Sequence, residues 1–498
     1  MATRTRMAGT AERGGRRGER GGREQLFRGG RQQQRLQRRP ARGASNTRVR
    51  FPKDTYFATC HPGLEPALAS ELRGLPGVLE VTEGRAGVNF LGSKGIETRY
   101  RANLELRSAI RVLELLAECQ LELDGNERGG GDSVYDAIRK IDWREYIPRG
   151  CTFKVKAVVW DNTEVTSSLL VSIRTRDAVC DCLRDDAGWR PEDPRDSAPD
   201  VPLQVVVYRD SMKIYLDTSR ESLHKRGYRE VMHAASLNES AAAGMLLLAG
   251  ASPGDTTAVL ADPMAGSGTF LIEAGLIATR TAPGLLFGRD RWELWERWDD
   301  FEADAFDRVV REAEDRVLWN RRGLPTLMGN DAHPSAVALA TADARRAGLS
   351  DMISFDNGNC AEWEPSTTPD RVITNPPWGQ RLMSESRGED QGILDDETFL
   401  ERSGLVQSWR ELGSFLKTQC PGAEANVLSG SRTVTRHLRL SATRKRRVTL
   451  GGVDCRLLQY SIRDRVETGG EPTCFLCGKP GHIKRDCPEN PKNNNAMM

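Results

Sequence analysis

The stretch Asp262-Pro263-Met264-Ala265-Gly266-Ser267-Gly268-Thr269 decides the fold of the larger part of this chain. A short apolar segment, 257–261, precedes it, and a longer apolar segment, 270–278, follows it. A buried strand, a turn of small residues and a helix in this order are typical of a doubly wound α/β sheet, in which the helix N-terminus faces a ligand. We therefore predict a cofactor site here that is formed by Asp262, Gly266, Gly268 and Thr269. A Gly-x-Gly pair alone also occurs in dinucleotide sites and in structural turns, but no Walker lysine follows it.

The next two predicted strands end in polar residues that belong to the same edge of the sheet. Segment 325–328 leads to Asp331, whose carboxylate is placed to accept hydrogen bonds from ribose hydroxyls. The alternative for Asp331 is a helix N-cap. Segment 353–355 is followed by Asn359, where an adenine amino group could be recognised. Both residues are predicted to bind the cofactor.

The strongest signal follows the fourth predicted strand, 371–374, and reads Asn375-Pro376-Pro377-Trp378. Two prolines directly after a central strand remove backbone donors and make the turn rigid. The amide oxygen of Asn375 and the carbonyl of Pro376 can then accept hydrogens from an exocyclic amine, and Trp378 offers a flat face for a base. We predict that these four residues form the catalytic turn. The alternative is a strand-terminating turn with a core tryptophan.

Composition divides the chain of 498 residues into several units. Residues 1–50 hold fifteen arginines and three glutamates, a local charge of +12, although the whole chain carries only +2. Three Arg-Gly-Gly triplets and few apolar residues predict that 1–54 is a disordered tail that binds RNA. A transit peptide and an inert linker are the alternatives.

Residues 55–220 predict an α+β module without a catalytic constellation. Its expected strands and helices alternate along the chain. The strands are 55–60, 78–82, 87–91, 152–159, 203–208 and 213–217, and the helices are 64–72, 96–116 and 167–183. Residues 221–465 predict the doubly wound α/β domain, followed by a polar linker at 466–473.

Cysteines point to one metal and to a reducing compartment. Residues 474–487 contain Cys474, Cys477, His482 and Cys487 at a spacing that suits one tetrahedral structural zinc, and a frayed tail, 488–498, follows. The other eight of the eleven cysteines are scattered, which predicts free thiols rather than a disulfide scaffold. We expect an intracellular protein of the nucleus, nucleolus or cytoplasm, with a plastid or mitochondrion as the alternative. No apolar run is long enough to cross a bilayer, so no membrane partner is expected.

The motif Asp-Pro-x-x-Gly-Ser-Gly, followed by Asn-Pro-Pro-aromatic, resembles the class I amino methyltransferases. The fuller resemblance is to THUMP-domain RNA guanine-N2 methyltransferases, and within them to the first half of the bacterial fused enzyme that modifies large-subunit ribosomal RNA. It rests on SLHKRGYR at 222–229, LNE at 237–239, 262–285 and NPPWGQRL at 375–382. The resemblance implies a Rossmann-like methyltransferase domain preceded by a ferredoxin-like and THUMP module, an S-adenosylmethionine (SAM) cofactor that Asn238 helps to bind, and an rRNA guanine as substrate.

Three departures from that family are visible. Asn359 stands where the family usually has Asp, Trp378 stands in place of the commoner Tyr, and a segment like the retroviral zinc knuckle follows where the fused enzyme has a second methyltransferase. The family's insertion corresponds to 280–325, whose Trp292, Trp295 and Trp298 we expect to serve packing. Adenine-N6, tRNA guanine or protein glutamine methylation, and an inactive RNA-binding protein, remain as alternatives. Nothing in the sequence calls for an obligate protein partner.

Overall fold

The computed structural model describes residues 49–121, 131–194, 197–230, 236–253, 258–288, 291–378, 404–464, 476–477 and 479. The arginine-rich tail up to residue 48, the linker 466–473 and the tail 488–498 lie outside the described residues, as do Cys474, His482 and Cys487. None of the described helices is both long and apolar enough to cross a membrane.

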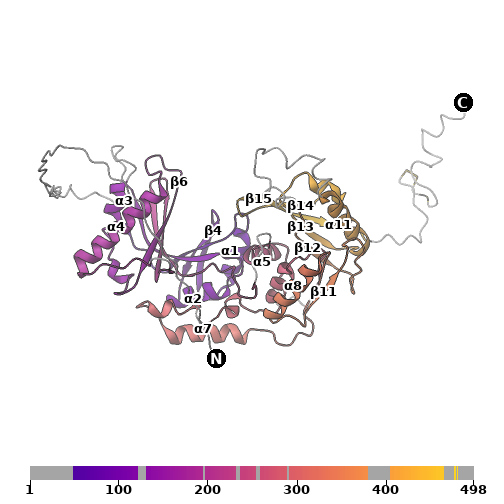
Figure 1. Cartoon of the computed structure of the whole chain (residues 1–498), viewed down its shortest axis with the longest axis horizontal. Helices are drawn as coiled ribbons and strands as arrows, with labels where there is room; N and C mark the ends of the chain where they lie inside the picture. The colour runs from indigo at the N-terminus through magenta and orange to yellow at the C-terminus, as the bar shows by residue number, and fades with distance from the viewer. Residues whose placement is uncertain are drawn as a thin grey trace, which may run out of the picture. The chain divides into compact units, whose positions relative to one another are not determined.

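The first part of the chain forms a mixed sheet, drawn in indigo and purple in Figure 1. Within the described residues it has eight strands in the order β3-β4-β2-β5-β8-β7-β6, with β1 pairing on β5. The strands are β1 (Val49–Arg50), β2 (Thr55–Thr59), β3 (Val78–Gly84), β4 (Gly87–Gly92), β5 (Arg111–Gln120), β6 (Phe153–Trp160), β7 (Val201–Tyr208) and β8 (Ser211–Asp217). The helices are α1 (Glu65–Gly74), α2 (Ile96–Glu105), α3 (Gly131–Ile138) and α4 (Ser168–Ala187), with the 3-10 turn η1 (Trp143–Glu145).

The prediction of one helix over 96–116 was wrong. The helix α2 ends at Glu105, and 111–120 is the strand β5, which pairs with β2 and β8. This strand lies in the middle of the sheet and is buried on both faces, so its apolar residues run almost without interruption. Such a run resembles a buried helix in sequence, and only the pairing with distant strands decides for the strand.

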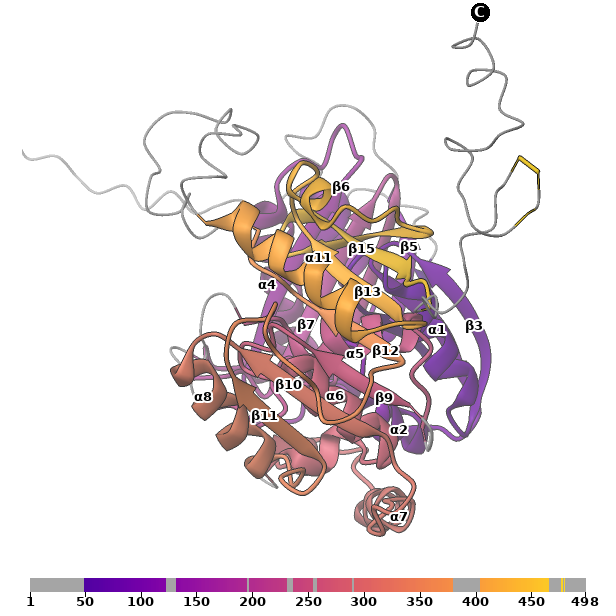
Figure 2. The ribbon, with the colours of Figure 1, turned by 90° about the vertical axis from the view of Figure 1, so that its right-hand side faces the viewer.

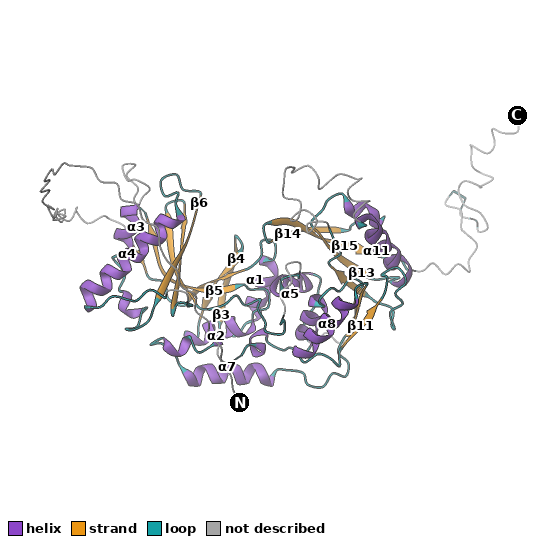
Figure 3. Ribbon diagram, in the orientation of Figure 1, coloured by secondary structure: helices purple, strands orange, loops and turns teal. Residues whose placement is uncertain are grey.

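The helices of this part cover one face of the sheet. Alternate residues of β6, β7 and β8 point to that face, among them Phe153, Leu203 and Ile214, and pack with apolar residues of α3 and α4. Figure 3 shows α3 and α4 together on the same side of β6. The period-2 alternation of the strands therefore leaves a second face that these helices do not cover.

The second part of the chain is the doubly wound sheet that the Gly-rich turn predicts. Within the described residues it has seven strands in the order β11-β10-β9-β12-β13-β15-β14, and β9 to β13 are parallel while β15 is antiparallel to β13. The strands are β9 (Val259–Asp262), β10 (Thr326–Asp331), β11 (Ile353–Asn357), β12 (Arg371–Thr374), β13 (Glu424–Ser429), β14 (Arg444–Leu450) and β15 (Val453–Ser461). The order reverses between β10, β9 and β12, and ligands of open α/β sheets bind at such a point.

Helices pack on both faces of this second sheet. The described helices of this second part are α5 (Glu239–Leu248), α6 (Thr269–Ala278), α8 (Pro334–Arg346) and α11 (Leu405–Gln419), with the 3-10 turn η6 (Val434–Leu438). The insertion between β9 and β10 adds α7 (Ala303–Asp315) and the 3-10 turns η2 (Pro283–Leu286) and η4 (Trp295–Arg297). Apolar residues of α5, α6 and α8 share one core with Leu260 and Leu327. The other face, with Ala261 and Met328, packs against α11, which lies over β13 in Figure 2.

The insertion between β9 and β10 packs on the first part of the chain rather than on its own sheet. Trp292, Trp295 and Trp298 are buried in the core that contains β6, β7 and β8, as their expected packing role requires. The indole N–H of Trp295 donates to the Thr218 carbonyl at 2.9 Å, and that of Trp298 donates to the Asp200 carbonyl at 2.9 Å. These contacts tie the insertion to the first part of the chain.

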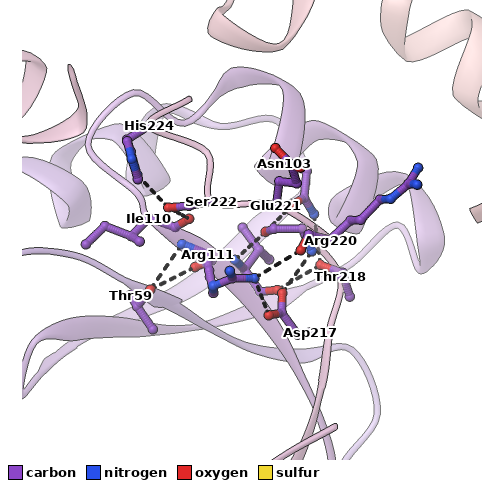
Figure 4. A network of polar contacts seen from close by, with 12 residues as sticks. Thr59, Asn103, Ile110, Arg111, Asp217, Thr218, Arg220, Glu221, Ser222 and His224 are labelled. Atoms are coloured by element: carbon purple, nitrogen blue, oxygen red, sulfur yellow. Dashed lines mark hydrogen bonds and ion pairs between the residues drawn. The ribbon is translucent and has the colours of Figure 1, made fainter. Parts of the chain in front are cut away.

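A polar network holds the segment that leaves β8 for the second sheet (Figure 4). The guanidinium of Arg111 lies 2.5 Å from Asp217 and 3.4 Å from the Arg220 carbonyl. The hydroxyl of Ser222 lies 2.6 Å from Nδ1 of His224. Because burial is the main cause that lowers the pKa of His224 to about 4, the imidazole stays neutral at physiological pH.

Candidate active site

The turn between β9 and α6 has the open geometry that a cofactor needs. Gly266 and Gly268 have positive φ angles of 55° and 73°, which disfavour other residues. A Cβ at Gly268 would lie 2.9 Å from the Phe355 ring, whereas a Cβ at Gly266 would meet no atom within 4 Å. No side chain of the described residues caps the first turn of α6. The open space beside Gly266 and the uncapped amides of α6 fit the adenosyl and methionyl parts of SAM.

Asp331 faces this turn from the end of β10. Its carboxylate accepts from the Gly266 amide at 2.9 Å and from the His333 amide at 2.9 Å. The second bond supports the start of α8, whose N-cap is His333 itself. Asp331 is therefore not the N-cap itself, although its carboxylate supports the start of α8 and lies beside the Gly-rich turn. Its contact with a ribose stays a prediction.

Asn330, the residue before it, was missed by sequence reasoning although it organises the same edge. Its side-chain amide is buried and donates to the Pro263 carbonyl at 3.2 Å and to the Gly358 carbonyl at 3.0 Å, and its own carbonyl accepts from the Ala265 amide at 2.8 Å. One side chain in β10 thus connects the turns that follow β9 and β11. The signal in the sequence was a buried polar residue directly before the acid.

Asp262, the last residue of β9, is a buried carboxyl with few compensating contacts. It is 1% exposed and accepts from the Met264 amide at 3.2 Å. Burial, reinforced by the nearby charge of Asp331, raises its pKa to about 7, although the Thr374 hydroxyl beside it and the Met264 amide lower the pKa. The carboxyl is therefore poised to ionise when a positively charged ligand group approaches it.

This raised pKa makes the stability of the cofactor-free protein depend on pH. The folded protein holds the proton of Asp262 up to about pH 7, whereas the unfolded chain releases it near its ordinary pKa, so stability should fall as the pH rises between these values. From pH 5.5 to 8 we expect wild type to lose about 2 kcal/mol more stability than Asp262→Asn, because the variant keeps only the pH dependence of the other groups. Urea unfolding at both pH values measures the difference. An equal pH dependence of the two proteins would contradict the assignment.

The Asn-Pro-Pro-Trp turn lies at the same edge, because β12 is paired directly with β9. Within the turn, the indole N–H of Trp378 donates to the side-chain oxygen of Asn375 at 2.8 Å. The Pro377 carbonyl accepts from the indole of Trp409 in α11 at 2.8 Å, which anchors the turn from behind. The internal bond uses one lone pair of the Asn375 oxygen and leaves a second one for a substrate amine.

Gly430, which follows β13, permits this position of Trp378. A Cβ there would lie 1.9 Å from the Trp378 ring, so any other residue would displace the tryptophan. Sequence reasoning did not single out Gly430. Nothing in the local sequence singles it out, since its partner Trp378 is 52 positions away in the printed sequence.

Two predicted cofactor residues make structural contacts instead of standing free. The side-chain oxygen of Asn238 accepts from the Ala241 amide at 3.1 Å and caps α5. The side-chain oxygen of Asn359 accepts from the Ala361 amide at 2.8 Å, and its amide donates to Glu411 at 3.1 Å. Their roles toward a cofactor stay predictions.

The segment SLHKRGYR at 222–229 connects the site to the rest of the protein. Arg229 donates to the hydroxyl of Thr269, the first residue of α6, and pairs with Glu239 at 3.3 Å. Burial raises the pKa of Glu239 to about 7, and the Arg229 charge opposes this rise. The contact to Thr269 fixes the residue that begins the helix behind the Gly-rich turn.

Of the four predicted zinc ligands, the structure describes only Cys477. The described residues contain no group of three or more potential metal ligands. The zinc site as a whole therefore stays a prediction.

A seven-stranded, mainly parallel sheet with a Gly-rich turn, an acid after the next strand and an Asn-Pro-Pro turn at one edge defines a class I methyltransferase fold. Four family models match this chain in order. They are the RlmL ferredoxin-like domain at 55–113, the THUMP domain at 131–217, the RMKL-like methyltransferase domain at 226–391 and a zinc knuckle at 472–489.

Relatives extend over most of the chain. A putative RNA methyltransferase of Synechocystis sp. is 30% identical, over 82% of this chain and 96% of its own length. The chain therefore belongs to the family of RNA methyltransferases that joins a THUMP domain to an RMKL-like methyltransferase domain. The ribosomal RNA large subunit methyltransferase K/L of Syntrophotalea carbinolica is 34% identical over 84% of this chain, which spans 55% of that relative.

The fold also matches a solved structure. A putative methyltransferase that was crystallised in complex with SAH superposes with a TM-score of 0.66 at 24% identity, over 83% of this chain and 99% of the other. The predicted fold class, a ferredoxin-like and THUMP module before a Rossmann-like methyltransferase domain, is confirmed.

Proposed function

We propose that this protein is a SAM-dependent RNA methyltransferase that forms N2-methylguanosine in large-subunit ribosomal RNA. The observation that carries the proposal is the pairing of β9 with β12, which sets the Gly-rich turn and the Asn-Pro-Pro-Trp turn side by side at one edge of the sheet. The names of the K/L relatives and the complex of a structural neighbour with SAH support the substrate class and the cofactor.

The residues present fit this chemistry. The cofactor would lie against Gly266 and Gly268, with Asp331 at the ribose and Asp262 near the charged end, and it supplies the electrophilic methyl group. Asn375 and the Pro376 carbonyl would orient the exocyclic amine of the base and favour the positive charge that develops on it. Trp378 would stack on the extruded base and offset part of the cost of unstacking. Alignment of the amine with the methyl group replaces a covalent nucleophile.

Methyl transfer from labelled SAM to total RNA that lacks this modification tests the proposal. Digestion to nucleosides should place the label in N2-methylguanosine within the large ribosomal RNA. Label in N6-methyladenosine or in a ring-methylated base would overturn the substrate assignment, and label in transfer RNA would overturn the choice of ribosomal RNA.

Asp331→Ala should weaken SAM binding by about tenfold while the protein stays folded, because the ribose hydroxyls lose a charged acceptor. Calorimetry with SAM measures the affinity. Asp351→Ala is the matched control, since Asp351 is an exposed acid of the same domain whose one ion pair among the described residues is with Arg321, at 3.7 Å. Equal affinities of the two variants would remove Asp331 from the cofactor site.

We also propose that residues 474–487 bind one structural zinc and add RNA affinity. The zinc knuckle match at 472–489 supports this reading. Deleting 470–498 should weaken binding to RNA several-fold and leave SAM affinity unchanged, because the described methyltransferase fold ends before the knuckle begins. Mass spectrometry under native conditions should show one zinc in the full chain and none in the truncated one. A loss of SAM affinity would contradict the modular assignment.

We place the protein in a reducing compartment, in the nucleus, nucleolus or cytoplasm. Eight cysteines of the described residues are buried and unpaired, which supports this proposal. Fluorescence imaging of a tagged full chain tests it, and import into a plastid or mitochondrion would overturn it.

A further inference from the structure

The face of the first sheet that lies opposite α4 carries an unusual set of side chains. Because residues alternate along a strand, Lys154, Lys156, Val158 and Trp160 of β6 share this face, and their partners in the register of β7 include Val206 and Tyr208. Both lysines are exposed, and Val158 is 47% exposed. Lys213 continues the face onto β8, and beyond it Tyr215 is buried, at 5% exposure, in a small apolar cluster with Leu113, Leu115 and Phe57. The accessible basic and aromatic residues of this face therefore lie mainly on β6 and β7.

Aromatic rings and guanidinium groups are stacked at one end of this face. The rings of Trp160 and Tyr208 lie 4.2 Å apart at an interplanar angle of 24°. The Arg85 guanidinium lies 4.5 Å from the centre of the Trp160 ring, and the Arg209 guanidinium lies 5.1 Å from that of Tyr208. Aromatic faces and guanidinium planes are the surfaces on which unpaired bases stack.

The charges of this face are suited to phosphates. Three acids near this face are already paired with basic side chains. Glu118 lies 3.5 Å from Lys213, Asp161 lies 3.0 Å from Arg209, and Asp217 lies 2.5 Å from Arg111.

Lys154 and Lys156 form no ion pair with any residue that the structure describes. Their charges therefore remain available, although Lys156 is close enough to Asp217 to oppose the burial that raises the pKa of that carboxyl. Lysines are depleted in protein–protein interfaces, whereas a basic surface with interleaved aromatic residues is typical of proteins that bind single-stranded nucleic acid.

We propose that this face binds a single-stranded segment of the RNA substrate, with bases on the stack of Arg85, Trp160, Tyr208 and Arg209 and phosphates on Lys154 and Lys156. The inference rests on the proposed RNA substrate and extends it, because it assigns the surface that holds the RNA away from the methylated base. Stacking tolerates any base, so the face would anchor the substrate without reading its sequence.

Binding of a fluorescent single-stranded RNA of about a dozen nucleotides, with mixed sequence, to the full chain tests this surface. Trp160→Ala and Tyr208→Ala should each weaken binding by about tenfold, at both low and high salt, because stacking does not depend on counterion release. Replacing Lys154 and Lys156 together by glutamine should weaken binding at low salt and reduce its salt dependence. Trp160→Phe should stay within about twofold of wild type, since it keeps an aromatic face.

Trp319→Ala is the matched control, because Trp319 is a tryptophan with 76% exposure that lies outside the sheet. Unchanged SAM affinity and circular dichroism show that each variant is folded. Binding by Trp160→Ala that equals binding by Trp319→Ala would overturn the proposal, and so would tighter binding of the same RNA as a duplex. The assay measures affinity for RNA and does not depend on the methylated product. Its result can therefore be interpreted even if the wild-type enzyme methylates another base or no base.

Discussion

Replacing Asn375 by alanine should lower turnover by about a hundredfold or more, while the affinity for SAM changes little. The side-chain oxygen of Asn375 lies in the turn after β12, beside the Gly-rich turn, and keeps a free lone pair although Trp378 donates to it at 2.8 Å. An acceptor for the amine matters most when the amine gains positive charge in the transition state. Single-turnover methyl transfer at saturating RNA, together with calorimetry for SAM, separates the two effects.

Variants of Trp378 serve as controls for this result. Trp378→Phe removes the N–H that donates to Asn375 but keeps a face for the base, so it should weaken turnover far less than Asn375→Ala. Trp378→Tyr should also be mild, whereas Trp378→Ala should weaken RNA engagement and turnover together. Full turnover of Asn375→Ala would show that the amine is oriented by other groups and would refute the catalytic role of the turn.

Replacing Arg226 by methionine should destabilise the protein by about 3–5 kcal/mol, because it leaves the Glu273 carboxylate buried without its partner. The side chains of Arg226 and Glu273 are both 0% exposed and lie 3.4 Å apart. Arg226 also donates to the carbonyls of Leu223, at 2.6 Å, and of Arg107, while the Tyr228 hydroxyl donates to Glu273 at 3.2 Å. Equilibrium unfolding in urea measures the loss.

The neighbouring Lys225 provides the control, since its side chain is 54% exposed and pairs only loosely with Glu221 at 3.8 Å. Lys225→Met should cost little. Adding Glu273→Leu to Arg226→Met should recover part of the lost stability, because the double variant buries no unpaired charge. An Arg226→Met protein as stable as wild type would show that Glu273 accepts a proton or that water reaches it.

The buried pair of Arg226 and Glu273 also connects the first part of the chain with the methyltransferase domain. Arg107 follows α2 of the first part, Glu273 lies in α6 behind the Gly-rich turn, and Arg226 connects them. Arg229, three residues later, holds Thr269 at the start of α6. We therefore expect Arg226→Met to weaken SAM binding as well, at temperatures where it is still folded.

Local sequence patterns were sufficient to predict much of the second sheet. The apolar segments 257–261, 353–355 and 371–374, each followed by glycine, acid or proline, predicted the parallel strands and the edge where they end. These signals are local because strand ends, tight turns and helix starts depend on backbone preferences within a few residues. In the first sheet, local patterns gave the wrong prediction for 111–120. This strand is buried on both faces and has the apolar content of a helix, so its pairing with β2 and β8 decides its conformation.

By itself, the sequence determined the fold class, the order of the modules and the turn residues Gly266, Gly268 and Asn375 to Trp378, because backbone chemistry specifies those turns directly. Only the tertiary structure decided that Asn330 joins the turns after β9 and β11, that Gly430 makes room for the Trp378 ring and that Arg226 is paired inside the core. It also decided that Trp160, Tyr208 and Arg85 form one stack. Each of these contacts joins residues that are far apart in the chain, and burial and close packing, which act through space, carry no local signal.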